Sequence, residues 1–179
     1  RRKAAVANLL RVFGWKDEDF EKDFGDIDTG SVKYIQATLK KDQGRTLDES
    51  YLEIYKRIRP GDLATIENVR SLIDAMFRRL DRYDLSEVGR FKMNQRLGTS
   101  KTADDGHLIT LEDLVRIVRE IIILNKNEAA EPDDIDHLGN RRVRPVGELI
   151  QSRLRLGLQR MRRIVQDRMS TLDIQTMTP

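Results

Sequence analysis

The sequence lacks cysteine altogether, and aromatic residues make up only 6% of it. Without cysteine the chain has no disulfide framework, no thiolate zinc site and no cysteine nucleophile, and this fits a reducing compartment. The low aromatic content argues against an aromatic-rich β-sandwich. A chain of this length needs neither a disulfide nor a metal to fold.

Long apolar runs are also missing. The longest apolar runs, such as residues 121–124, are four residues long. A membrane span needs about 18–20 residues. The first residues contain no apolar core of a signal peptide, so we expect no membrane partner. The chain does not begin with Met, and we expect it to be a piece of a longer polypeptide.

What the sequence does contain is charge. Charged residues make up 35% and hydrophobic residues 39% of the 179 residues, against about 25% and 45–50% in a typical globular chain. This composition favours a charged, mostly helical protein that is long enough to bury a core of its own. The regular patterning of its apolar residues argues against a wholly disordered chain.

The positive charge is concentrated in one segment near the end. Residues 141–168 hold only two acids, Glu148 and Asp167, but nine arginines, so that the segment carries +7 while the net charge of the chain is +3. The rest of the chain therefore carries −4. Such asymmetry suggests a polyanionic partner, with a solvated basic face as the alternative. The nine are Arg141, Arg142, Arg144, Arg153, Arg155, Arg160, Arg162, Arg163 and Arg168.

Apolar periodicity and helix-capping residues predict a succession of helices. A Thr–x–x–Asp pattern at Thr110–Asp113 predicts a capped helix rich in apolar residues, central to a core. Thr65 is a candidate N-cap for a helix through Phe77, and Asp84 or Ser86 for one that Gly98 ends. The other predicted helices of the first part span residues 4–13, 17–23, 31–41 and 48–58.

Periodicity disappears between residues 125 and 145, and a long helix is predicted from Pro145 to about Met169. We therefore predict a helical domain over 1–130 and, over 131–179, an irregular acidic and basic loop followed by a long basic helix. Gly147 and Gly157 in that helix suggest close approach of another backbone. One side carries an apolar stripe, formed by Ile150, Leu154, Leu158, Met161 and Val165.

No motif indicates a catalytic centre. The chain has no glycine-rich phosphate loop, no nucleophile motif and no metal-ligand spacing around its two histidines, His107 and His137. The carboxylates of Asp133, Asp134 and Asp136 are candidates for Mg²⁺, but we favour a solvated or arginine-paired acidic loop. We therefore predict neither catalytic residues nor a metal site in this chain.

The segment 140–144, Asn-Arg-Arg-Val-Arg, is the sharpest candidate for binding. Guanidinium groups match both phosphate and the O6/N7 edge of guanine, and a nearby carboxylate can accept from the N1–H and N2–H₂ edge. From the residues alone, nucleic-acid contact and salt bridging between subunits remain equally open.

Residues 133–144 resemble the β subunit of bacterial DNA-directed RNA polymerase, and the resemblance continues through 146–149 and 155–158. It also extends backwards through residues 52–61 and 82–90. It covers nearly the whole chain, and the block 133–144 is long enough to be specific. The departures, such as Pro145 where Ser or Thr is usual, affect local turns only.

The resemblance implies that residues 1–130 form part of the β-subunit lobe and 131–179 a segment of the protrusion, in a larger α+β subunit. In the family, Asp136 and Arg141 match positions of a pocket for an unstacked guanine of the non-template strand, with Ile135 and Arg163 adjoining it. The catalytic Mg²⁺ belongs to the partner β′ subunit, so that the chain alone is expected to be inactive and to hold no cofactor.

The implied partners are DNA and the other polymerase subunits (α, β′, ω and sigma factor), with transcription factors as further candidates, and the implied location is the cytoplasm at the nucleoid. Two rival classes stand beside this interpretation. A stand-alone regulator would need a helix-turn-helix pair, but a long irregular loop precedes the arginine-rich helix. A helical protein-docking module that binds transcription factors or acidic subunits is the stronger alternative.

Overall fold

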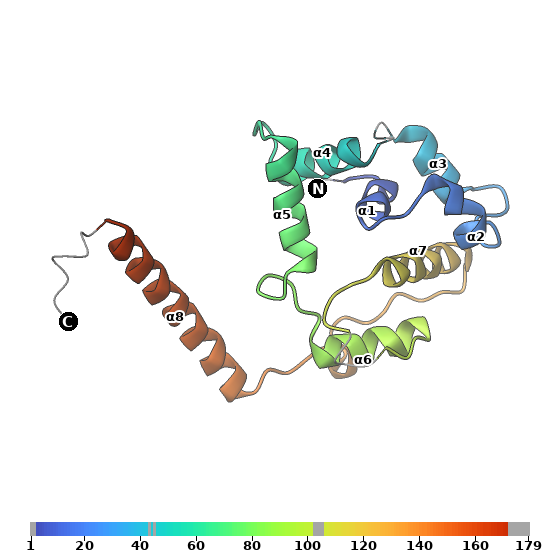
Figure 1. The fold of residues 1–179 in the computed structure, drawn as a ribbon. Helices are drawn as coiled ribbons and strands as arrows, with labels where there is room; N and C mark the ends of the chain where they lie inside the picture. Colours follow the sequence, from blue (N-terminus) through green and yellow to red (C-terminus); the bar gives the residue numbers. More distant parts are fainter. Residues whose placement is uncertain (1–2, 43, 45, 102–105, 172–179) are drawn as a thin grey trace. The chain divides into compact units, whose positions relative to one another are not determined.

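The computed structural model describes residues 3–42, 44, 46–101 and 106–171. These residues form eight α-helices, two short 3₁₀ helices and no strand (Figure 1), so the prediction of a mainly α protein is confirmed. The chain divides into two compact units, Arg1–Ala130 and Glu131–Pro179, here called unit 1 and unit 2. Among the helices of the described part, none is long and apolar enough to cross a membrane. The assignment of the two ranges to lobe and protrusion stays a prediction.

Unit 1 contains seven of the α-helices, and most of them begin and end within a few residues of the predicted positions. The 3₁₀ helix η1 and α2 together replace the single helix predicted over 17–23. The elements are α1 (Val6–Val12), η1 (Asp17–Asp19), α2 (Phe20–Phe24), α3 (Tyr34–Lys41), α4 (Leu47–Ile58), α5 (Ile66–Arg78), α6 (Ser86–Leu97) and α7 (Leu111–Lys126).

The short helix α1 lies between two apolar clusters and joins them. Its Leu10 belongs to a cluster with Trp15, which follows α1, and with residues of α2, α3 and α7, namely Phe24, Ile35, Leu114, Val118 and Ile122. Its Val12 belongs to a second cluster with residues of α4 and α5, namely Tyr51, Ile54, Tyr55, Val69 and Ile73. Leu9 of the same helix and Phe13, which follows its last residue, pack against both clusters. A helix of seven residues therefore contributes to both apolar clusters of unit 1.

Reciprocal capping boxes start α4 and α7. Thr110 accepts a hydrogen bond from the Asp113 N–H, and the Thr110 N–H donates to the Asp113 carboxylate at 3.0 Å. Thr46 and Glu49 make the same exchange at α4. Both boxes satisfy backbone N–H groups that the first helical turn leaves unpaired. The predicted capped helix at Thr110 is confirmed.

Only some of the apolar residues of α7 are buried in the core. Leu114, Val118 and Ile122 are buried, but Ile121 and Ile123 are about half exposed, at 50% and 46%. The residues recur at a spacing of four, which places one stripe of α7 against the core. Through this stripe the helix takes part in a core, as predicted.

Helix α3 begins at Tyr34, three residues later than predicted, because its capping group comes from further away. The buried carboxylate of Asp28 accepts hydrogen bonds from the backbone N–H groups of Tyr34, Ile35 and Gln36, at 2.6, 3.1 and 3.2 Å. An acidic group at this end also interacts favourably with the helix dipole. The side chain of Asp28 thus defines where α3 starts.

The ends of α6 follow the predicted residues with one difference. Asp84 accepts a hydrogen bond from the Ser86 N–H at 2.8 Å, while Leu85 occupies the formal N-cap position. Ser86 has a positive φ of 59°, which is uncommon for a residue other than glycine. Gly98 ends the helix in the left-handed conformation, at φ 63°, as predicted.

A buried group of charges joins α6 to the start of α7. Arg90 and Asp113 are 2% and 0% exposed, and their side chains form an ion pair at 3.1 Å. Arg90 also donates to the carbonyl oxygens of Gly106 and Leu108, and Lys101 lies 2.9 Å from the Asp113 carboxylate. Burial raises the pKa of Asp113, but the hydrogen bonds from Lys101, Thr110 and Arg90 outweigh it and leave that pKa below its usual 3.8.

Unit 2 consists of an irregular loop with the short 3₁₀ helix η2 (Leu138–Asn140) and the 26-residue helix α8 (Val146–Thr171). Pro145 precedes the helix, and its carbonyl oxygen accepts from the N–H groups of Glu148 and Leu149. It therefore stands at the cap and not inside the first turn. The helix extends two residues beyond the predicted Met169.

Candidate nucleic-acid interface

The loop that holds three of the predicted binding residues is braced by its own side chains. The carboxylate of Asp134 accepts from the Asp136 N–H at 2.9 Å, and its backbone carbonyl accepts from the Asn140 side chain at 2.8 Å. His137 accepts from the Gly139 N–H at 3.1 Å at the start of η2. These bonds within the loop give it a defined local shape.

Asp136 and Arg141 flank η2, one on each side of this short helical turn. Both are exposed, as is Ile135, whose side chain is 78% exposed. Within the described residues neither the Asp136 carboxylate nor the Arg141 guanidinium has an ionic partner. One acceptor, one forked donor and one apolar side chain are therefore presented to solvent from a braced loop.

The two arginines that follow are engaged by an acid. Glu148, in the first turn of α8, forms ion pairs with Arg142 at 3.0 Å and with Arg144 at 3.9 Å. Because these pairs are partly exposed, they contribute little to stability, about 0–1 kcal/mol each. They do tie the loop to the start of α8. They also neutralise part of the positive charge of residues 141–168.

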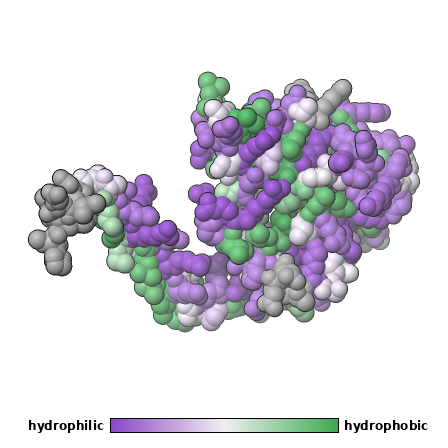
Figure 2. Space-filling view, viewed as in Figure 1, coloured by the Kyte–Doolittle hydropathy of each residue, from purple (hydrophilic) through white to green (hydrophobic). Residues whose placement is uncertain are grey.

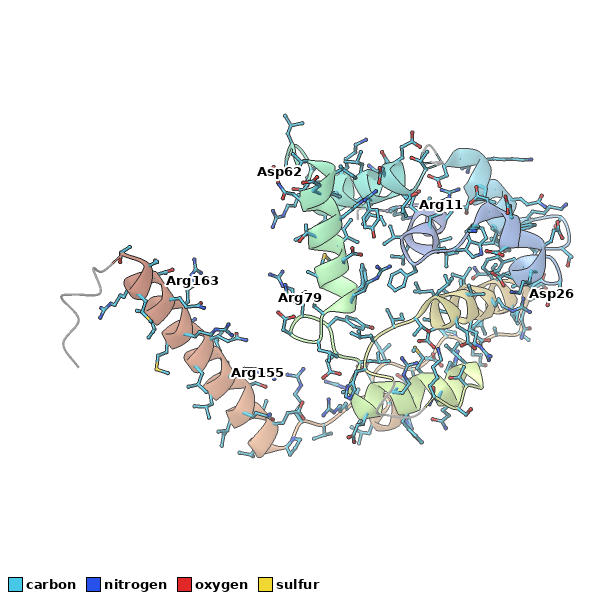
Figure 3. The ribbon with its side chains drawn as sticks, in the orientation of Figure 1. Arg11, Asp26, Asp62, Arg79, Arg155 and Arg163 are labelled. Atoms are coloured by element: carbon cyan, nitrogen blue, oxygen red, sulfur yellow. The ribbon has the colours of Figure 1, made fainter. Side chains whose placement is uncertain are left out.

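The remaining arginines of the segment lie along α8 (Figure 3, where Arg155 and Arg163 are labelled). At about 100° per residue, Arg153 and Arg160 fall on one margin of the apolar stripe and Arg155 and Arg162 on the other. Arg163 falls about 180° from Leu154, on the opposite side of the helix. The helix thus presents guanidinium groups over most of its circumference.

The structure places Ile135, Asp136 and Arg141 in one loop. Among the described residues, no contact joins Arg163 to them. Arg163 lies 17 residues after the first residue of α8, which is about 26 Å along its axis at 1.5 Å per residue. Four hollows of about 370–500 Å³ lie on unit 1 and are lined by other residues. The predicted site is therefore an exposed surface and not an enclosed pocket.

Sequence reasoning missed the part that Asp134 plays. From the sequence this residue was a candidate magnesium ligand or, as favoured, part of a solvated or arginine-paired loop, whereas in the structure its carboxylate accepts from the Asp136 backbone N–H. The signal was present, because Asp residues commonly bond the backbone two residues further on in turns. Among the described residues, no three acidic or histidine side chains are grouped as they would be around a metal ion.

The apolar stripe of α8 is exposed within the described residues. None of the residues of α8 is buried, and Figure 2 shows apolar residues gathered along one side of the helix. At the position that a Cβ would occupy on Gly147 or Gly157, no atom lies within 4 Å. The close backbone approach predicted for these glycines is absent from the described residues.

Comparison with known proteins places these features in a family. The family described as RNA polymerase Rpb2, domain 2, matches residues 4–144, and this range includes Ile135, Asp136 and Arg141. The chain belongs to this RNA polymerase β-subunit family. The resemblance drawn from residues 133–144 is thereby confirmed.

Curated relatives support the same assignment over the full chain. The DNA-directed RNA polymerase subunit beta of Arthrobacter sp. (strain FB24) is 37% identical, and that of Streptomyces avermitilis is 38% identical. Both alignments cover 100% of this chain and 16% of the relative. The chain thus spans about one sixth of the length of the β subunits that it matches.

Proposed function

We propose that this chain acts as a segment of the β subunit of DNA-dependent RNA polymerase, where it helps to form the DNA channel and contacts the non-template strand. The observation that carries the proposal is the braced loop of a β-subunit family member, which presents Asp136 and Arg141 on either side of η2. In the complete enzyme, which transfers nucleotidyl groups to RNA, α, β′, ω and sigma factor would be its partners.

The proposed chemistry follows from the groups present. A guanine that leaves the base stack offers donors at N1 and N2, which a carboxylate accepts, and acceptors at O6 and N7, which a guanidinium fork matches. Unstacking costs a few kcal/mol, so these contacts and an apolar wall, for which Ile135 is the candidate, must offset that cost. Arg163 would contribute positive charge near the strand. Catalytic Mg²⁺ would be held by β′, and the chain itself would be inactive.

Salt dependence tests the contact with nucleic acid. We expect the 179-residue chain to bind single-stranded DNA weakly, with an affinity that falls roughly 20- to 130-fold between 50 and 200 mM salt if about three to five phosphates are contacted. Fluorescence anisotropy of a labelled oligonucleotide measures this. Replacing Arg141 or Arg163 with Gln should lower both the affinity and the slope, whereas Arg79→Gln on unit 1 serves as the matched control.

The same titration distinguishes DNA binding from the alternative function, that of a protein-docking module. If the arginines serve acidic proteins, the chain binds polymerase subunits or transcription factors but shows no salt-sensitive DNA binding. DNA binding that is unchanged across this salt range would contradict the contact with phosphates.

A further inference from the structure

Asp134 makes two hydrogen bonds that hold both ends of the loop around η2. Its carboxylate accepts from the backbone N–H of Asp136 at 2.9 Å, and its backbone carbonyl accepts from the side-chain amide of Asn140 at 2.8 Å. Asp136 is one of the two residues proposed to contact guanine, and Asn140 directly precedes the other, Arg141. One residue therefore links the backbone on both sides of η2.

The turn between these two ends is closed by its own backbone. The N–H of Asn140 donates to the carbonyl oxygen of His137 at 2.9 Å, and the N–H of Arg141 donates to that of Leu138 at 3.3 Å. The space inside the turn is small, because a Cβ on Gly139 would lie 3.0 Å from Nδ1 of His137. The arginine therefore extends from a closed turn and not from a free loop.

The separation of the two contacting residues decides whether one base can meet both. Asp136 and Arg141 are five positions apart in the sequence, so an open segment could place their Cα atoms as far as about 17 Å from each other. The edges of a single guanine need one short separation, and a contact that must first order its own loop is weaker. A loop that already holds the two residues in place avoids this loss.

We propose that Asp134 is a positioning residue for the selection of guanine, which acts through the backbone of Asp136 and, by way of Asn140, through that of Arg141. The inference rests on the proposed function, in which this loop meets the non-template strand. In this role Asp134 does not touch the base. What matters is its capacity to accept hydrogen bonds and not its charge, so an amide in its place would still serve.

Three variants separate the acceptor from the charge. Asp134→Ala removes the acceptor, Asp134→Asn keeps an acceptor oxygen without the charge, and Glu131→Ala, at another exposed acid of unit 2, is the control. Each is placed in the full-length β subunit of the assembled polymerase, and binding of bubble DNA is measured with each of the four bases at successive non-template positions. Asp134→Ala should lower the preference for guanine about 2- to 12-fold, the range of one hydrogen bond. Asp134→Asn and Glu131→Ala should keep it.

Two further variants distinguish positioning from direct contact. In an Asp136→Ala background, Asp134→Ala should lower the preference no further, because the carboxylate that it positions is gone. Asn140→Ala, which removes the other hydrogen bond to Asp134, should by itself lower the preference in the same range.

The outcomes that overturn the proposal are distinct. A preference unchanged by Asp134→Ala, or lowered as much by Asp134→Asn, would show that the hydrogen bond to the Asp136 backbone does not set it. Additive losses in the double variant would make Asp134 a contact of its own. If Asp136→Ala lowers the preference and Asp134→Ala does not, this inference fails alone. If neither does, the proposed function fails with it.

Discussion

Replacement of Arg90 by alanine is expected to lower the free energy of unfolding of unit 1 by about 3–5 kcal/mol, because it removes one partner of a buried ion pair and leaves Lys101 to balance the buried carboxylate. The remaining partner would be Asp113, which is fully buried and held in the capping box of α7. The carbonyl oxygens of Gly106 and Leu108 would lose their donor as well. A loss of this size is a large fraction of the stability of an ordinary domain.

Urea denaturation followed by the fluorescence of Trp15 measures this loss, because Trp15 is the one tryptophan of the chain and is buried in unit 1. The matched control is Arg79→Ala, which removes an exposed ion pair with Asp81 and should cost less than about 1 kcal/mol. Equal effects of the two substitutions would contradict the assigned importance of the buried pair.

The pH dependence of stability tests the buried pair of Arg90 and Asp113 in a second way. The pKa of Asp113 is lowered in the folded state, so the folded state binds the proton less tightly than the unfolded state. The contribution of this carboxylate is therefore complete above its ordinary pKa of 3.8 and is lost as the pH falls below it. The Arg90→Ala variant, which weakens the interactions of the charged form, should lose less stability over that range.

Phe24→Ala is the second substitution with a large expected effect, a loss of about 3–5 kcal/mol. The Phe24 side chain is 0% exposed and makes edge contacts with Trp15 at a ring-centroid distance of 6.0 Å and tilted contacts with Phe20 at 6.5 Å. Removing its ring leaves a cavity in the cluster that joins α1, α2, α3 and α7. The surrounding helices can refill such a cavity only in part.

The same urea titration, monitored by far-ultraviolet circular dichroism because Trp15 adjoins the cavity, measures the effect. Phe91→Ala is the matched control, since Phe91 lies on α6 and is 64% exposed. It should change the free energy of unfolding by no more than about 0.5 kcal/mol. A Phe24→Ala variant as stable as Phe91→Ala would show that the core of unit 1 is not centred on Phe24.

Features that depend on neighbours in the sequence were predictable. The pattern Thr110-Leu-Glu-Asp113 predicted the capping box of α7, and Gly98 predicted the end of α6, because both devices act within one helical turn. The start of α3 was not predictable in this way. Its cap, Asp28, lies six residues before the first helical residue, and nothing in local spacing distinguishes it from the other acids nearby.

Contacts between distant residues also escaped prediction. Arg90 is one of many arginines in the sequence, and only the fold brings it to Asp113 at the start of α7. For the candidate site, the shape of the loop around Asp136 is local and partly readable from its Asp and Gly residues. No contact among the described residues joins Arg163 to that loop, so that neither local spacing nor the helix pattern specifies how the two are related.

The recognition of guanine tests the central claim most directly. In the assembled polymerase, binding to bubble DNA is measured with each of the four bases at successive positions of the non-template strand. We predict a preference for guanine at one position, and Asp136→Ala should reduce it by about 1–3 kcal/mol, roughly 5- to 150-fold. Glu131→Ala, another exposed acid of unit 2, should leave it intact. A base preference that is unchanged by Asp136→Ala would contradict the assignment of this loop to the non-template strand.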